Sequence, residues 1–145
     1  MLAQSFLKPE TLGLSDEQHA ALVKVLGMLE RGEIEYYRAR FPDEQSCTIG
    51  SSRSSPSKFN MVSFYRAEEC GTVSCICGWA EHVGGLPRRS LSSMRIWNPQ
   101  LGLLFEPPVL NFGAQGILDI QPDQAAVALR NYLTTGHAMW QEILV

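Results

Sequence analysis

The sequence predicts a mainly α protein: a compact single-domain helical fold with irregular connections and, at one place, a choice between a helical turn and a short β-hairpin. Two observations carry this prediction. Apolar residues recur at helical spacing near both ends of the chain and in a shorter segment between them. The chain also has 145 residues, 45% of them hydrophobic, which suits one globular domain over 1–145 with a buried core.

The first predicted helix covers residues 16–31. Ser15 and Gln18 have the spacing of a capping box, in which each residue satisfies a backbone N–H of the other. Gly32 follows where a left-handed residue commonly ends a helix. The expected buried face consists of Leu22, Val25, Leu26 and Leu29.

A strand or short extension is expected over the aromatic segment 33–41. It is followed by a serine-rich stretch, 42–58, that has little apolar surface to bury. We predict that this stretch is a mobile surface loop. Cys47 lies within it, and we interpret this thiol as incidental.

The segment Cys70–Ala80 reads CGTVSCICGWA and contains three of the four cysteines. After Gly71, Thr72 is a good N-cap for a helix running to about residue 83. Gly78 inside that helix costs about 1 kcal/mol relative to alanine, which suggests close packing by another helix or by the Trp79 ring. The expected buried face consists of Ile76, Trp79, Ala80 and Val83.

Between residues 86 and 116, short apolar pieces alternate with Pro, Gly and Asn, and NPQLG fits either a hairpin turn or the start of a helical turn. A clearer helix begins at Pro122 and ends at Gly136. Trp140 follows in an expected short terminal helix. The tryptophans are interpreted as core aromatics: Trp79, Trp97 and Trp140.

Four motifs resemble a family of small uncharacterized bacterial and phage-encoded proteins. They are FNM at Phe59–Met61, CGTVSCICGWA at Cys70–Ala80, LFEP at Leu104–Pro107 and ALRNYLTTGHAMW at Ala128–Trp140. The serine-rich loop and Cys77 depart from the family pattern. The resemblance implies an architecture and no activity.

The cysteines allow three interpretations. A structural zinc site is not expected, because Cys70, Cys75 and Cys77 have no second ligand pair and the last two would point about 200° apart on a helix. No other metal or cofactor is expected. Cys75, in the first turn of the predicted helix, could be an activated thiol with Cys70 as its resolving partner. We favour the third interpretation, in which the cysteines pack as small hydrophobic residues.

Charge and hydropathy restrict the function further. The net charge of −3 implies no general attraction to nucleic acid. No stretch approaches the roughly 20 apolar residues of a membrane span, and no signal peptide is recognisable, so we expect a cytoplasmic protein. The middle of the chain is mildly basic, and weak nucleic-acid binding by Arg88, Arg89, Arg95 and Trp97 is a minor alternative.

The leading hypothesis is a noncatalytic binding or interaction module of bacterial or phage origin. Its partner would be an unidentified protein or a second copy of the chain. The alternative from another class is a thiol-dependent redox or transfer enzyme that uses Cys75 and Cys70. We consider an enzyme the weaker hypothesis, because the sequence places no histidine base beside these thiols.

Overall fold

Helices dominate the part of the chain that the computed structural model describes, which is residues 5–36, 58–59, 73–74, 76–87, 89–107 and 120–143. The predicted mainly α fold is confirmed. The helices, including the 3-10 helix η3, are α1 (Pro9–Leu12), α2 (Asp16–Glu30), α4 (Ile76–Val83), η3 (Ser92–Ile96), α5 (Pro99–Phe105), α7 (Pro122–Thr135) and α8 (Trp140–Ile143).

α2 begins and ends as its sequence predicts. The Ser15 hydroxyl accepts a hydrogen bond from the Gln18 backbone N–H at 3.1 Å, and the Gln18 side chain accepts one from the Ser15 N–H at 2.9 Å. The helix ends at Glu30, and Gly32 follows with a φ of +73°. Its predicted apolar stripe is buried. Local capping and one apolar face therefore define this helix.

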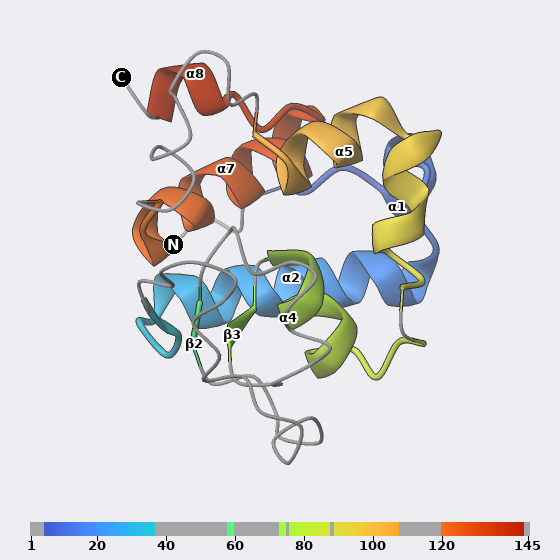
Figure 1. Cartoon of the computed structure of the whole chain (residues 1–145). Coiled ribbons are helices and arrows are strands. Elements are labelled where there is room, and N and C mark those ends of the chain that lie inside the picture. The colour runs from blue at the N-terminus through green and yellow to red at the C-terminus, as the bar shows by residue number, and fades with distance from the viewer. Residues whose placement is uncertain are drawn as a thin grey trace.

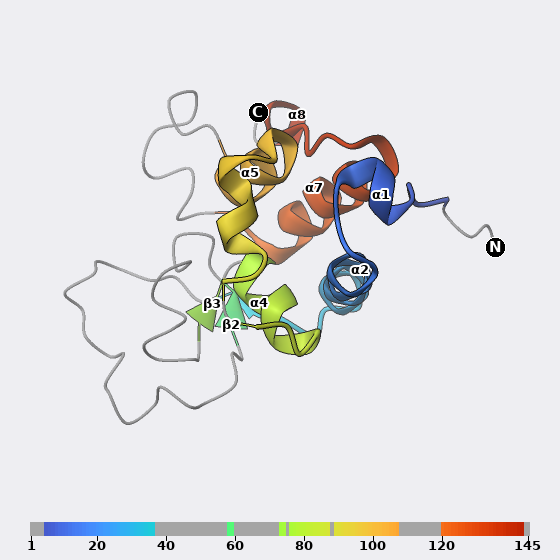
Figure 2. The same cartoon turned by 90° about the vertical axis from the view of Figure 1, so that its right-hand side faces the viewer.

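α2 lies at the centre of the core, between α7 on one side and α4 on another (Figure 1). Figure 2 shows α2 end-on, with α4 beside it and with α1 and α7 nearby. Side chains from these helices and from α5 bury one another, and each fully buried aliphatic side chain contributes about 1.5–3 kcal/mol. The largest fully buried side chains include Trp140, Tyr132, Phe105, Leu22 and Leu26.

The helix predicted to start at Thr72 begins later, at Ile76. Val73–Ser74 instead form strand β3, which pairs in parallel with β2 (Lys58–Phe59), and β2 pairs in parallel with β1 (Glu35–Tyr36). The predicted start was wrong because pairing with a distant strand commits this backbone to an extended conformation. The three strands of the described residues form one sheet in the order β1–β2–β3.

Most of the predicted buried face of α4 is confirmed, and Val83 is only partly buried. Ile76, Trp79 and Ala80 are buried, and Gly85 ends the segment with a φ of +62°. Close approach to α2 occurs at Gly84, where an added Cβ would lie 2.5 Å from the Ala21 Cβ. Only glycine lets the end of α4 come this near to α2 without a shift of the backbone.

The helices η3 and α5 occupy this part of the chain, which settles the choice between a hairpin and a helical turn. NPQLG is the start of α5: the Asn98 side chain accepts a hydrogen bond from the Leu101 N–H at 3.2 Å, and Pro99 occupies the first turn. The Asn98 amide also donates to the Leu12 carbonyl at 3.1 Å. This one side chain caps α5 and attaches it to α1.

α7 follows its prediction closely. Pro122 lies in its first turn, and Gly136 ends it with a φ of +89°. Gln121 and Gln124 also form a capping box, which the sequence analysis did not anticipate. In α8, Trp140 is 1% exposed and its indole N–H donates to the Leu103 carbonyl at 3.0 Å, so its predicted core position is confirmed.

The loop predicted over 42–58 falls outside the described residues, apart from Lys58, which belongs to β2 rather than to a loop.

Within the described ranges, no helix combines the length and the apolar character that crossing a bilayer requires. The core is formed mainly by α2, α4, α5 and α7.

Candidate functional site

The predicted cysteine site is only partly within the described chain. Cys70, Gly71, Thr72 and Cys75 lie outside it, whereas Gly78 and Trp79 belong to α4. α4 begins at Ile76, later than the sequence predicted. The use of Cys70 and Cys75 in catalysis stays a prediction.

Cys77 is the cysteine that the structure describes, and it is 1% exposed. Its Sγ lies 3.8 Å from the Glu81 Oε2, one helical turn further along α4. This thiol packs in the core. The favoured interpretation predicted the same packing for all three cysteines of Cys70–Ala80.

The histidines lie on separate elements. His19 on α2 donates from Nε2 to the Leu7 carbonyl at 2.9 Å, His82 is at the end of α4, and His137 follows α7. Among the residues with a described position, no three His, Cys, Asp or Glu side chains are grouped closely enough to hold a metal ion.

Glu81 fixes the connection from α4 to η3. Its carboxylate accepts hydrogen bonds from the Arg89 N–H at 3.1 Å and from the Leu91 N–H at 2.9 Å. Arg89 has a φ of 69°, which is uncommon for a residue other than glycine. Charge-assisted hydrogen bonds of this kind are stronger than neutral ones. Glu81 thus holds a strained turn in place, and that turn positions the start of η3.

The main exposed apolar feature of the described surface is the pair Ile96 and Trp97, whose residues are 80% and 67% exposed. We call it the Ile96–Trp97 corner, because the chain turns there from η3 into α5. The prediction that Trp97 is a core aromatic was wrong. Leu91, directly before η3, and Met94 within it are in the core, and the chain leaves the helix at Trp97.

The backbone under the corner is held from several sides. The Trp97 N–H donates to the Met94 carbonyl at 3.1 Å, and the neighbouring Asn98 side chain is bonded to both α1 and α5. A Cβ at Gly102 would lie 3.0 Å from the Arg95 carbonyl oxygen, so η3 packs tightly on α5. Two exposed apolar side chains are therefore presented on a fixed support.

The charge beside the corner is balanced. Arg95 forms an ion pair with Glu106, with 3.1 Å between Nε and Oε2. Glu106 therefore offsets one of the cations that the nucleic-acid hypothesis requires. The side chain of Arg88 lies outside the described part of the structure.

Comparison with known proteins gave no matching family model, no matching curated protein and no matching solved structure. The resemblance to the bacterial and phage family stays a prediction. The physical arguments for a function therefore come from the surface of the chain itself.

Proposed function

We propose that this protein is a noncatalytic interaction module of a bacterial or phage cytoplasm, and that it binds a partner protein through the Ile96–Trp97 corner. The observation that carries the proposal is the exposure of two adjacent large apolar side chains on a fixed backbone. Single exposed apolar residues are common on protein surfaces, but adjacent ones that include a tryptophan are more informative.

Tryptophan is among the residues that most often dominate the energy of a protein interface. Burying the exposed part of the Trp97 ring in an apolar pocket of a partner would contribute roughly 2–4 kcal/mol. Association also costs ordering entropy, and that cost is lower when the backbone beneath the side chain is already fixed. The hydrogen bonds of Trp97 and Asn98 supply this support.

Nucleic-acid binding is the less favoured use of the same corner. Trp97 could stack on a base. Phosphate contacts, however, usually provide most of the affinity for nucleic acid, and Arg95 is already paired with Glu106. The chain also has a net charge of −3. A protein partner agrees better with these charges.

Site-specific photo-crosslinking tests the proposal. The photoreactive residue p-benzoylphenylalanine is placed at position 97 in one variant and, as a control, at the exposed position 24 of α2 in another. Both are expressed in cells of the source organism, irradiated and analysed by mass spectrometry. We expect a discrete protein adduct from position 97 and none from position 24.

The identity of the adduct decides among the hypotheses. An adduct of twice the chain mass would identify a second copy as the partner. Adducts of nucleic acid at position 97 would contradict the proposal, and so would crosslinking at position 97 no stronger than at position 24.

A further inference from the structure

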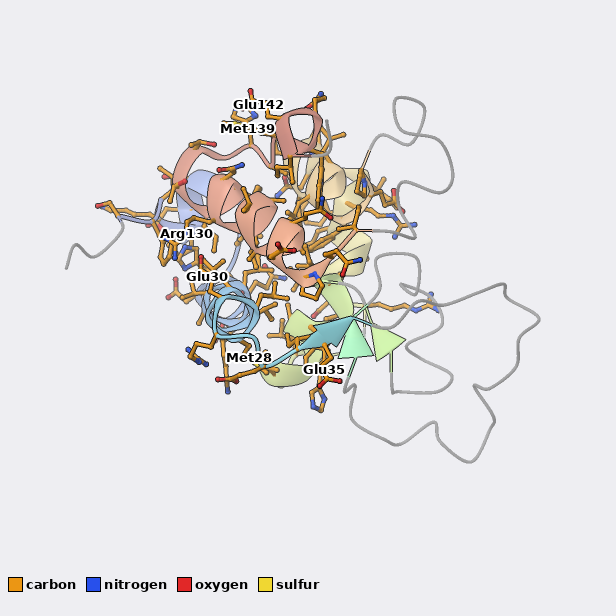
Figure 3. All side chains as sticks on the ribbon, turned by 90° about the vertical axis from the view of Figure 1, so that its left-hand side faces the viewer. Met28, Glu30, Glu35, Arg130, Met139 and Glu142 are labelled. Carbon is orange, nitrogen blue, oxygen red and sulfur yellow. The ribbon has the colours of Figure 1, made fainter. Side chains whose placement is uncertain are left out.

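A depression lies between α5 and the segment joining α7 to α8. It has two adjoining pockets with volumes of about 220 and 200 Å³, and Gln100 and His137 line both of them. We call it the His137–Gln100 depression. Met139 lines the first pocket and leads into α8 (Figure 3), and Tyr132 lines the second.

Its two shared residues offer a hydrogen-bond donor and an acceptor. His137 donates from Nδ1 to the Gln100 Oε1 at 3.0 Å. In the neutral ring Nδ1 therefore carries the proton, and Nε2 keeps a lone pair that can accept a hydrogen bond. The Gln100 side chain retains its NH₂ group as a donor. Among the described residues, neither the His137 Nε2 nor this NH₂ group has a partner.

The walls carry no fixed charge. Neither pocket is lined by a Lys, Arg, Asp or Glu of the described chain. Tyr132 lines the second pocket, and its buried hydroxyl forms no hydrogen bond with the described residues. Apolar walls come from Leu103, Met139 and Trp140. A charged ligand would lose its hydration without compensation here, so an uncharged one fits better.

The backbone at Met139 is strained and firmly held. Met139 has a φ of 60°, and its carbonyl accepts a hydrogen bond from the Glu142 N–H at 3.0 Å. The preceding carbonyl, of Ala138, accepts one from the Asn131 amide at 3.1 Å. Strained residues that their surroundings hold in place occur frequently at ligand sites.

We propose that the His137–Gln100 depression binds an uncharged amide group. An amide presents a carbonyl acceptor and an N–H donor, which complement the Gln100 NH₂ group and the His137 Nε2. Apolar groups next to the amide would occupy the two pockets. Ile96 and Trp97 line neither pocket, and this proposal does not depend on the function proposed for their corner.

The test is a titration of the ¹⁵N-labelled full chain, followed by two-dimensional NMR, with three related probes. 4-Methylpentanamide has a primary amide as its only polar group, N-methyl-4-methylpentanamide has a secondary amide, and 4-methylpentanoate has a charged carboxylate and no amide. We expect saturable shifts at Gln100, His137 and Met139 with at least one amide probe, at several-fold lower concentration than with the carboxylate. Binding of the primary amide alone indicates a free or side-chain amide, whereas binding of both amides indicates a peptide main chain.

Three variants complete the test: Gln100→Leu, His137→Ala and, as a control on another element, His82→Ala. A thermal melt of each confirms that it is folded. Gln100→Leu and His137→Ala should each weaken amide binding at least fivefold, and His82→Ala should leave it unchanged. If one variant fails to fold, the other decides. Equal binding of amide and carboxylate probes, no binding of either amide, or unchanged affinity in a folded Gln100→Leu or His137→Ala variant would overturn the proposal.

Discussion

Arg130 on α7 donates two hydrogen bonds to the carboxylate of Glu30 on α2, from Nε to Oε2 and from Nη2 to Oε1, both at 2.7 Å. Figure 3 shows the two residues next to each other where the helices meet. Arg130 also lies over the Phe6 ring, 5.7 Å from its centroid. One guanidinium thus links α2, α7 and the N-terminal segment, and its hydrogen bonds lower the pKa of Glu30.

Replacing Glu30 by glutamine should lower the free energy of unfolding by about 0.5–1 kcal/mol at neutral pH, since both partners are partly exposed and water screens the pair. Because the pKa of Glu30 is lowered in the folded state, its contribution is present above the ordinary value of 4.5 and is lost as the pH falls through the lowered pKa. Urea unfolding of both proteins from pH 7 to pH 3 measures this. A difference that stays constant over that range would contradict the account. Glu33→Gln, which removes a more exposed pair with Arg31, should have a smaller effect.

Replacing Trp79 by alanine should lower stability far more than replacing Trp97. Trp79 is 5% exposed, so Trp79→Ala should cost about 3–5 kcal/mol of stability. Trp97 is 67% exposed, and Trp97→Ala should change stability by no more than about 0.5 kcal/mol. Thermal and urea melts measure both. A melt of Trp79→Ala that matches the parent would show that this ring is not part of the core.

Tyr132 should make the protein less stable in alkali. Burial raises the pKa of its hydroxyl from 10.0 to about 12. The folded state therefore holds this proton more tightly than the unfolded state does, and the contribution is complete below pH 10 and is lost as the pH rises towards 12. The expected loss is roughly 2–3 kcal/mol.

The matched variant is Tyr132→Phe, which cannot ionise and also removes a buried hydroxyl with no partner among the described residues. It should be at least as stable as the parent at pH 7, because a buried unsatisfied hydroxyl costs about 1–3 kcal/mol. Its advantage should grow between pH 10 and 12. Parallel stability curves for the two proteins over that range would rule out the proposed environment of Tyr132.

The sequence predicted best those features that depend on neighbouring residues. The capping box of Ser15 and Gln18 and the ends of α2 and α7 at Gly32 and Gly136 follow from local hydrogen bonding and local backbone geometry. The apolar stripes of these helices follow from helical periodicity. Each of these signals lies within a few residues of the feature it predicts.

The features that the sequence missed depend on distant contacts. Thr72 looked like a helix cap because the pairing of Val73 with Lys58 leaves no local mark. Trp97 looked like a core residue because many large apolar side chains are buried, yet an apolar residue can equally stay at the surface. The hydrogen bond between Gln100 and His137 joins residues 37 positions apart. Only the packing of α5 against α7 brings them together.

Alkylation tests the thiol-enzyme alternative. Cys77 is buried, and we predict that it resists iodoacetamide in the native protein. We also predict that Cys75 does not react and that Cys47 reacts first. This order is expected if the cysteines of Cys70–Ala80 have a structural and not a catalytic role. Peptide mass mapping after brief labelling at neutral pH gives the order of reaction. Labelling of Cys75 ahead of Cys47 would instead favour a thiol-dependent enzyme.

The most direct test of the interaction module is calorimetric titration of the purified crosslinked partner into three forms of this protein: the parent, Trp97→Ala and the control Lys24→Ala. If Trp97 dominates the interface, its replacement should weaken binding at least 30-fold, which corresponds to about 2 kcal/mol. Lys24→Ala should bind like the parent. Equal affinity of a folded Trp97→Ala variant and the parent would contradict the claim that this protein acts through the Ile96–Trp97 corner.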